Sequence, residues 1–475
     1  MKIFTNKLNL KFTISTFLLF LLTTTLILTS CIKEPSFLNN ANLKFSSDTV
    51  YFDTIFTRKP GSSYPISVTK LLSIKNSENQ WVKANFNLMG GKNSPFKINI
   101  DGISGPTIQE IEIAPNDSVF LFVQCALEAN NQTQPSLIID SLTATVGSKS
   151  EKLILAAYGW DAHYIKDSIL PNNGLWNDKI KPYVIIGNAY IAPNQNFTIK
   201  EGVQVFASAQ TVFYVFGNLN MEGSKEFRIK IRGDKPVFQT SLYPNQWGGF
   251  YFAPGAKGNI SYSDITNATI GLRADSSNLD NSFNVVLKQT KIQFCGQACL
   301  AGYNGSIFAE NCLFADAGSY SFLALLGGDY TFNNCTFTEY SYFNSRQEGH
   351  VAITNTLRDG NGVLLNSKEL NIAFSNNIIW GYLTDEIIID KVSNTPFELN
   401  SFNNVLKTKN SLAIFDPSKN IFNKNPRFTD INTNLYKIDS LSSAYQSADF
   451  SSASKFDLLG ENRKIKPDIG CFEKQ

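Results

Sequence analysis

Histidine and charged side chains are scarce in this chain, and their scarcity excludes several kinds of function. Only His163 and His350 occur, which leaves few imidazole ligands for a zinc site. Charged residues make up 17% of the sequence, the formal net charge is +2, and no segment carries a basic stripe. Nucleic acid is therefore a poor partner, because domains that bind it carry clustered lysine and arginine. We expect no metal and no cofactor.

Long apolar runs are also absent after residue 30, so no later segment has the length of a transmembrane helix. The start of the chain differs. A basic stretch over residues 1–11 precedes an uncharged, mostly apolar run over 12–28, and small residues then lead to Cys31. This is the layout of a secretory signal peptide. The alternative is a short membrane anchor, but the run is barely long enough to cross about 30 Å of hydrocarbon.

The tetrapeptide Leu-Thr-Ser-Cys over residues 28–31 resembles the lipobox of bacterial lipoproteins. The resemblance implies that Cys31 is lipidated, and several acyl chains on one residue give stable anchoring. Residues 32–34 (IKE) resemble surface-export signals of some Gram-negative lipoproteins. We therefore expect an outer-membrane, lipid-anchored protein that faces the periplasm or the cell surface, with the membrane as a partner.

The other six cysteines do not have the spacing of a disulfide framework, although an oxidising compartment permits pairing. They are Cys125, Cys295, Cys299, Cys312, Cys335 and Cys471. Cys295 and Cys299 are close enough in sequence to pair. Cys312 and Cys335 are better explained as stacked inward thiols of successive repeats.

Abundant Asn, Ser, Thr, Phe and Tyr, with frequent turn residues, predict an all-β chain and argue against helices. The length exceeds one ordinary domain and suggests two. The expected parts are a signal peptide (1–30), a lipid-anchored tether (31–42), a β-sandwich (43–160), and a solenoid (165–475) with a C-terminal cap from about residue 410.

Between residues 43 and 160, seven or more short β-branched and aromatic runs are separated by Gly, Pro, Asn and Asp. Short strands at this spacing predict a β-sandwich. The early FDTIF segment (52–56), the SPFKI strand (94–98) and the PNDS turn (115–118) resemble the Hydin-like, immunoglobulin-type sandwiches of bacterial surface proteins. No cluster of catalytic or metal-binding residue types occurs in this region, so we expect the domain to be a spacer or a binding module.

The second region contains internal repeats. Short β-runs recur between residues 264 and 404 with steps of 21 to 27 residues, and one step of 42 accommodates two coils. This period predicts a single-stranded parallel β-solenoid, in which coils stack at about 4.8 Å and equivalent residues form columns. Leucine-rich repeats share the period but have a signature that is absent here. Helical periodicity, which an α-solenoid needs, is not found.

The repeats predict two columns. One is an inward apolar column of Ile265, Ile292, Leu313 and Ile378. The other is an asparagine ladder at a turn, made of Asn311, Asn334, Asn376 and Asn403. Amide ladders satisfy backbone groups of turns. Sugar contact is the alternative role for these asparagines, and the structural role is preferred.

Several motifs in this region resemble right-handed parallel β-helix proteins. Residues 201–205 (EGVQV) and 215–223 (VFGNLNMEG) are similar to their opening coils, and 246–252 (QWGGFYF) to their Trp-Gly-Gly-Ile strand. Residues 425–428 (NPRF) and 466–473 (KPDIGCFE) are similar to their closing segments, with Cys471 and Phe472 in place of the usual Ala and Tyr. The resemblance spans about 300 residues and implies a pectin lyase-like fold.

The right-handed β-helix fold hosts polysaccharide lyases, glycoside hydrolases and inert adhesins, so fold alone does not decide activity. No Asp-Asp pair and no motif of the polygalacturonase type occurs in the solenoid. The nearest polar cluster supplies the catalytic candidates, namely Asp316, Asp329, Arg346, Glu348 and His350. The candidate aromatic side chains for stacking on sugar rings from loops are Tyr243, Trp247 and Tyr303, followed by Trp176 and Trp380.

The sequence supports two hypotheses for the function of the protein. The preferred one is a non-catalytic cell-envelope lipoprotein whose β-helix presents a face to glycans or other surface ligands. The alternative is a polysaccharide-degrading enzyme, a lyase or glycoside hydrolase, on the same scaffold.

Overall fold

A computed structural model describes residues 35–57, 68–129, 135–234, 242–276, 282–340, 346–410, 413–429 and 431–475. Their contacts form two compact units. The first contains the described residues up to Phe52 and those of Ile66–Ala126 and Ile138–Ala157, and the second contains those of Asp53–Pro65, Leu127–Leu137 and Tyr158–Gln475. Within these described ranges the helices are two short 3-10 turns, η1 (Gly91–Asn93) and η2 (Ile431–Thr433), and no helix is long and apolar enough to cross a membrane.

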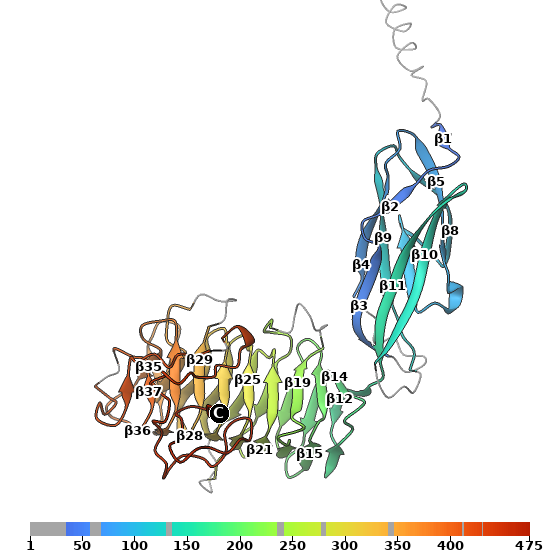
Figure 1. The fold of residues 1–475 in the computed structure, drawn as a ribbon. Helices are drawn as coiled ribbons and strands as arrows, with labels where there is room; N and C mark the ends of the chain where they lie inside the picture. The colour runs from blue at the N-terminus through green and yellow to red at the C-terminus, as the bar shows by residue number, and fades with distance from the viewer. Residues whose placement is uncertain are drawn as a thin grey trace, which may run out of the picture. The chain divides into compact units, whose positions relative to one another are not determined.

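The first unit is built from two packed sheets (Figure 1). One sheet runs β1 (Phe37–Leu38), β5 (Trp81–Leu88), β10 (Ser136–Val146), β11 (Lys149–Trp160) and β3 (Thr49–Phe56), with β8 (Thr107–Ile113) also paired to β5. The other runs β2 (Leu43–Phe45), β4 (Lys70–Asn76), β9 (Ser118–Cys125), β6 (Phe96–Ile100) and β7 (Ile103–Ser104). Strand β5 alternates buried and exposed residues, and Phe52 of one sheet meets Phe96 of the other at 5.9 Å between ring centroids. This alternation is that of a β-sandwich.

The second unit is a continuous parallel sheet of 25 strands that winds into a β-helix with three faces. Strand β12 (His163–Ile169) opens it. Face A contains the second half of β14 (Tyr183–Ile191), β17 (Val212–Val215), β20 (Gly249–Phe252), β23 (Ile270–Asp275), the first halves of β26 (Ala298–Glu310) and β28 (Tyr320–Asn333), β30 (Val351–Thr354) and β35 (Ile387–Asp390). The first half of β14 belongs to face C.

Faces B and C complete each coil. Face B contains β13 (Gly174–Trp176), β15 (Asn196–Lys200), β18 (Asn218–Glu222), β21 (Lys257–Ser261), β24 (Val285–Lys288), the second halves of β26 and β28, β33 (Leu370–Ser375) and β36 (Phe397–Phe402). Face C contains β16 (Gln204–Ala207), β19 (Ile229–Gly233), β22 (Ser263–Thr266), β25 (Lys291–Gln293), β27 (Leu313–Ala315), β29 (Thr336–Glu339), β34 (Ile378–Gly381), β37 (Val405–Leu406) and β38 (Ile421–Phe422). A hairpin of β31 (Thr356–Arg358) and β32 (Leu364–Ser367) projects from one coil.

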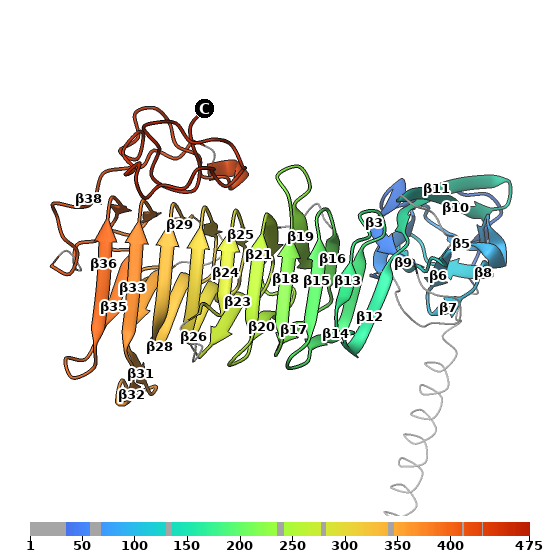
Figure 2. The same cartoon turned by 90° about the horizontal axis from the view of Figure 1, so that it is seen from below.

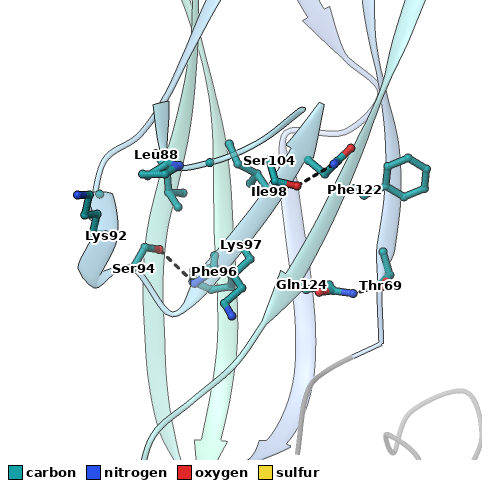
Figure 3. Close-up of a pocket in the computed structure, with 14 residues that line it drawn as sticks. Thr69, Leu88, Lys92, Ser94, Phe96, Lys97, Ile98, Ser104, Phe122 and Gln124 are labelled. Atoms are coloured by element: carbon teal, nitrogen blue, oxygen red, sulfur yellow. Dashed lines mark hydrogen bonds between the residues drawn. The ribbon is translucent and has the colours of Figure 1, made fainter. Parts of the chain in front are cut away.

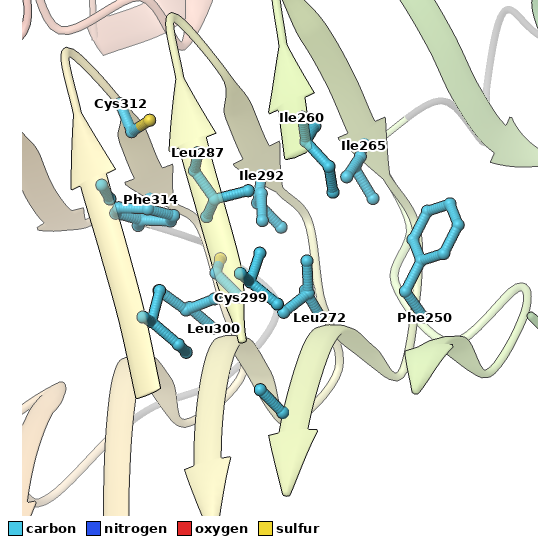
Figure 4. Close-up of a cluster of buried hydrophobic side chains, with 14 of the residues drawn as sticks. Phe250, Ile260, Ile265, Leu272, Leu287, Ile292, Cys299, Leu300, Cys312 and Phe314 are labelled. Atoms are coloured by element: carbon cyan, nitrogen blue, oxygen red, sulfur yellow. The ribbon is translucent and has the colours of Figure 1, made fainter. Parts of the chain in front are cut away.

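Each face sends apolar side chains into the core in columns (Figure 4). On face C, Ile265 pairs in register with Ile292, and Ile292 with Phe314. On face A, Leu272 pairs with Leu300, and on face B, Ile260 pairs with Leu287. Parallel pairing at constant register superposes these side chains, so each coil buries its inward residues only against its neighbours.

The prediction of one column was wrong for two of its four members. Phe314, not Leu313, stacks on Ile292, and Ile379, not Ile378, continues the column through Phe337. Adjacent strand residues point to opposite faces, so a one-residue error moves a side chain from the core to the outside. Leu313 and Ile378 are apolar because another part of the chain covers them there.

That covering part is the C-terminal segment of residues 423–475, seen at the upper left of Figure 2. Its buried side chains form two clusters on the outer side of face C. In one, Tyr436, Leu458 and Cys471 pack with Leu313, and in the other, Ile438 and Ile469 pack with Ile378. The segment has almost no regular structure, so side-chain contacts rather than strand pairing hold it to face C.

The predicted asparagine positions do share one corner of the coil, but their side chains do not form the ladder. Asn311, Asn334, Asn376 and Asn403 all have positive φ, between 50° and 58°, which asparagine tolerates better than most residues. Three of their side chains bond to the C-terminal segment instead. Asn311 Nδ2 donates to Ser454 Oγ at 2.7 Å, Asn334 Oδ1 accepts from Ser454 N at 2.9 Å, and Asn376 Oδ1 accepts from Asp449 N at 2.9 Å.

The amide ladder lies one residue further along the chain. Asn377 Oδ1 accepts the backbone N–H of Cys335 at 2.7 Å, and Asn404 Oδ1 accepts that of Asn377 at 2.8 Å. Asn404 Nδ2 donates to Asn420 Oδ1 at 2.9 Å, which carries the ladder into the last coil. Asn377 and Asn404 are fully buried, so these bonds satisfy backbone groups that water cannot reach.

The ladder predicts the effect of a single truncation. Asn404→Ala leaves the buried N–H of Asn377 without its acceptor, so we expect the free energy of unfolding to fall by about 3 kcal/mol. Asn400→Ala, at an exposed position of the preceding strand β36, should change it by less than about 0.5 kcal/mol. Urea denaturation of the full chain measures both, and equal effects would contradict the role of the ladder.

Candidate functional site

The outer side of face A carries a file of tyrosines in successive coils. Tyr190 of β14 pairs with Tyr214 of β17, and Tyr214 pairs with Tyr251 of β20. The rings of Tyr190 and Tyr214 are nearly parallel with centroids 5.2 Å apart, and those of Tyr214 and Tyr251 are 5.9 Å apart. All three side chains are partly exposed. We call these three residues the tyrosine file.

Arg273 of β23 continues this column, because it pairs in register with Tyr251. Its guanidinium lies 5.5 Å from the ring centroid of Tyr251 and 5.7 Å from that of Tyr303. Its Nε and Nη2 each donate to Asp275 at 2.7 Å, and this bidentate bond raises the pKa of Arg273. The Tyr251 hydroxyl also donates to Asp275, at 3.2 Å, and burial followed by the carboxylate raises its pKa.

A small groove of about 200 Å³ opens between these side chains. Tyr214, Tyr251 and Arg273 line it together with Gly248 and Gly249, which precede or begin β20. A Cβ on Gly249 would meet the carbonyl oxygen of Ile270 at 1.6 Å, and its φ of 112° favours glycine. The glycine pair therefore lets adjacent coils approach closely at the groove.

The structure brings part of the sequence-predicted polar cluster together, but mostly below the surface. Glu348 is exposed and lines a shallow groove of about 470 Å³ with Arg346 and Tyr320. Asp329 is partly buried and accepts a hydrogen bond from Asn371 Nδ2 at 3.0 Å.

His350 is fully buried in a column with Ser321 and Glu386. Ser321 Oγ lies 2.5 Å from His350 Nδ1, and His350 Nε2 lies 3.8 Å from Glu386 Oε2. Burial lowers the pKa of His350 well below its usual range, so the ring is neutral and its contact with Glu386 is not an ion pair. The partner of Glu386 is Arg346, whose Nη1 lies 3.1 Å away. The order Ser-His-Glu is that of some hydrolases, but a substrate cannot reach three side chains that are all sealed from solvent.

Asp316 is buried at the corner after β27 and is bound by the C-terminal segment. The Tyr436 hydroxyl donates to Asp316 Oδ1, and Gln293 Nε2 donates to Oδ2 at 3.4 Å. Burial raises the pKa of Asp316 to about 6, although both bonds oppose the shift. The neighbouring Glu339 is fully buried too, and burial raises its pKa well above normal. Asp316 therefore holds the C-terminal segment in place, whereas Glu339 accepts a hydrogen bond from Ala317 N at 2.7 Å.

The sequence-predicted aromatic residues fall into different environments. Trp247 is 1% exposed, and its indole N–H donates to the carbonyl oxygen of Thr266 at 2.8 Å. Trp176 and Trp380 are buried as well. Tyr243 is 48% exposed, away from the groove lining, whereas Tyr303 lies against Arg273. Of these five residues, Tyr303 is the one that adjoins the tyrosine file.

Cys31 lies outside the residues that the structure describes. The six other cysteines are buried free thiols, so Cys295 and Cys299 are not paired. Cys312 and Cys335 are inward members of the β-helix core, as stacked thiols should be. Within the described part of the chain, no group of three His, Cys, Asp or Glu residues is placed to hold a metal ion.

The first unit has a larger groove, of about 670 Å³ (Figure 3). Its lining includes Phe122, the Gln124 amide bonded to Thr69 at 2.7 Å, and two exposed lysines, Lys92 and Lys97. The groove lies beside β6 and combines an apolar floor with a polar rim. It has no set of groups in contact that points to chemistry.

Sequence reasoning missed the tyrosine file, Arg273 and Asp275. Tyr190 and Tyr214 are 24 residues apart, but Tyr214 and Tyr251 are 37 apart, so a fixed period does not align them. The connection between β19 and β20 is long and breaks the spacing. The sequence did contain one indication of the tyrosine file, because each of its tyrosines directly follows an apolar residue within its strand.

The buried carboxyl of Asp316 makes a pH prediction. Its folded pKa of about 6 exceeds the unfolded value of about 3.9, so the folded state binds the proton more tightly. The resulting stabilisation is fully present below about pH 4 and is lost as pH rises through about 6. Relative to the parent chain, Asp316→Asn should gain about 2 kcal/mol of unfolding free energy between pH 4 and pH 7. Urea titrations at several pH values measure this, and a pH-independent difference would contradict it.

Comparison with known proteins identifies the β-helix. The family model of the right-handed beta helix region matches residues 184–337, and no curated protein matches the chain. The ASH/PapD-like domain of human CEP192 aligns with 28% of this chain and 96% of its own at 10% identity and a TM-score of 0.18. A protein of unknown function from Porphyromonas gingivalis W83 aligns over 28% of this chain and 59% of its own, at 10% identity and a TM-score of 0.18. TM-scores this low say nothing about function. Residues 184–337 are therefore a right-handed β-helix region within an all-β chain.

Proposed function

We propose that this protein is a non-catalytic, lipid-anchored protein of the bacterial outer membrane that binds polysaccharide on face A of its β-helix. Cys31 carries the anchor, and the protein faces the periplasm or the cell surface. A right-handed β-helix fits a surface or polysaccharide-related role. The binding surface is the tyrosine file with Arg273 and Tyr303.

The observation that carries the proposal is the register of the tyrosine file. Three tyrosines in successive coils place apolar ring carbons and phenol hydroxyls along one line on a solvent-facing sheet. Sugars present the same alternation of C–H groups and hydroxyls, so the two surfaces match. Tyrosine loses little conformational entropy on binding, because only two side-chain torsions are fixed.

The non-catalytic reading rests on the placement of the acidic side chains. Glycoside hydrolysis uses two carboxyl groups that flank the scissile bond. Asp316 is sealed under the C-terminal segment, and Asp275 is held by Arg273 and Tyr251. Glu348 is exposed, but no other acidic side chain is among the described residues that line its groove. A lyase or hydrolase remains the alternative that the binding assay below also tests.

The first test is retention on a panel of immobilised polysaccharides. We expect the full chain to be retained by at least one of them without release of reducing or unsaturated ends. Tyr214→Ala with Tyr251→Ala should weaken retention at least about tenfold, since buried aromatic contacts contribute about 1 kcal/mol or more each. Phe308→Ala, a partly buried aromatic on face B, is the matched control and should leave retention unchanged.

Two results would overturn the proposal. Retention that survives the double tyrosine variant would move the site elsewhere. Cleavage of a retained polysaccharide that disappears with Glu348→Ala or Asp316→Ala would make the protein an enzyme.

The anchor has its own test in cells that carry the lipoprotein pathway. Wild-type protein should incorporate labelled fatty acid and sediment with outer membranes, because several acyl chains are needed for stable attachment. Cys31→Ala should take up no label. Membrane association and labelling that persist in Cys31→Ala would disprove lipidation at this residue, and Cys471→Ala serves as the cysteine control.

A further inference from the structure

Charge is almost absent from the strands that carry the tyrosine file. Strands β14, β17, β20 and β23 together contain two charged residues, Arg273 and Asp275. These two are bonded to each other at 2.7 Å through two donors. Their charges cancel, so the four strands that carry the file and Arg273 have no net charge, although their outer side is polar.

The Arg273–Asp275 pair is also held rigidly. The guanidinium lies against the rings of Tyr251 and Tyr303, and the Tyr251 hydroxyl donates to the carboxylate. An anionic sugar that approached Arg273 would also meet the Asp275 carboxylate, which is bonded to the guanidinium at 2.7 Å and already compensates its charge. Repulsion from this carboxylate opposes binding of a uronic acid. Sugar hydroxyls are uncharged, so they do not meet this repulsion.

The file also has definite ends. On one side, Tyr190 pairs with Ile169 of β12, and on the other, Arg273 pairs with Ala301, which is buried. Four successive positions from Tyr190 to Arg273 span three coil rises, or about 14 Å. A pyranose residue in an extended chain advances by about one coil rise, so the file matches a short internal stretch of a chain that runs along the helix axis.

We infer that the tyrosine file binds an uncharged pyranose polysaccharide, three to four residues at a time, with its chain parallel to the β-helix axis. This inference rests on the proposed function and adds the ligand class. Asp275 acts as a positioning residue that neutralises Arg273 and thereby excludes acidic chains.

The test uses pairs of probes that share a backbone and differ in charge. β-1,4-Mannan and β-1,4-polymannuronate share ring stereochemistry and linkage, and glucuronoxylan adds acidic branches to the backbone of xylan. In calorimetry on the full chain, the uncharged member of a pair should bind at least about tenfold more tightly. Affinity for oligosaccharides of the uncharged chain should rise with length up to three or four residues and then level off.

Asp275→Asn supplies the diagnostic variant. It frees the positive charge of Arg273, so the acidic probe should gain about tenfold in affinity, and this gain should vanish at high salt. Asp416→Asn changes the net charge equally in an exposed turn outside the site, and it should change neither affinity. Thermal unfolding and retained binding of the uncharged probe show whether Asp275→Asn is folded.

The outcomes separate the two claims. Tighter binding of the acidic member by the wild-type chain, lost with Tyr214→Ala, would overturn the inference and leave the proposed function standing. The inference would also be overturned if Asp275→Asn and the Asp416→Asn control had the same ratio of affinities for the acidic and the uncharged probe. Retention of no polysaccharide at all would overturn the proposed function, and the inference with it.

Discussion

The second unit depends on one constraint, which is the backbone hydrogen bonding between stacked coils. A single coil has no partner within itself for the N–H and C=O groups of its strands, so each coil is stable only in register with its neighbours. The register then fixes which side chains point inward on every face. Ile265, Ile292 and Phe314 superpose for this reason, and so do Tyr190, Tyr214 and Tyr251 on the outside. The register between stacked coils therefore determines both the core and the proposed binding surface.

The same constraint divides the outside of the β-helix into covered and open faces. Face C carries Leu313 and Ile378 outward, and the C-terminal segment buries them with Tyr436 and Ile469. Its corner asparagines bind that segment through Ser454 and the backbone. Face A keeps its aromatic and polar residues partly exposed, with tyrosines and a neutralised ion pair. A surface whose aromatic side chains repeat in three successive coils suits a ligand that also repeats.

The sequence was enough to predict the architecture but not the exact phase of the repeat. The period of the β-runs and the motifs near Gly202 and Trp247 predicted the β-helix. Two pairs of consecutive residues were ambiguous, Asn376–Asn377 and Leu313–Phe314. Both members of each pair are chemically similar, so the sequence does not show which of the two points inward. Tertiary contact with the C-terminal segment decided them, and no local pattern carries that information. The long β19–β20 connection hid the tyrosine file in the same way, by separating Tyr214 from Tyr251 in sequence and not in space.

The charged residues show why an ionisable cluster in sequence is a poor guide to a site in this fold. Arg346, His350 and Glu386 lie close together because their coils stack, and the core then excludes water from them. Removing one partner would leave a buried charge, so the cluster acts on stability. Arg273 and Asp275 are close because they are two residues apart on one strand, β23, and they lie against outward aromatic rings rather than in the core. The direction in which a column points, and not the residue types in it, therefore separates a structural ion pair from one that can select a ligand.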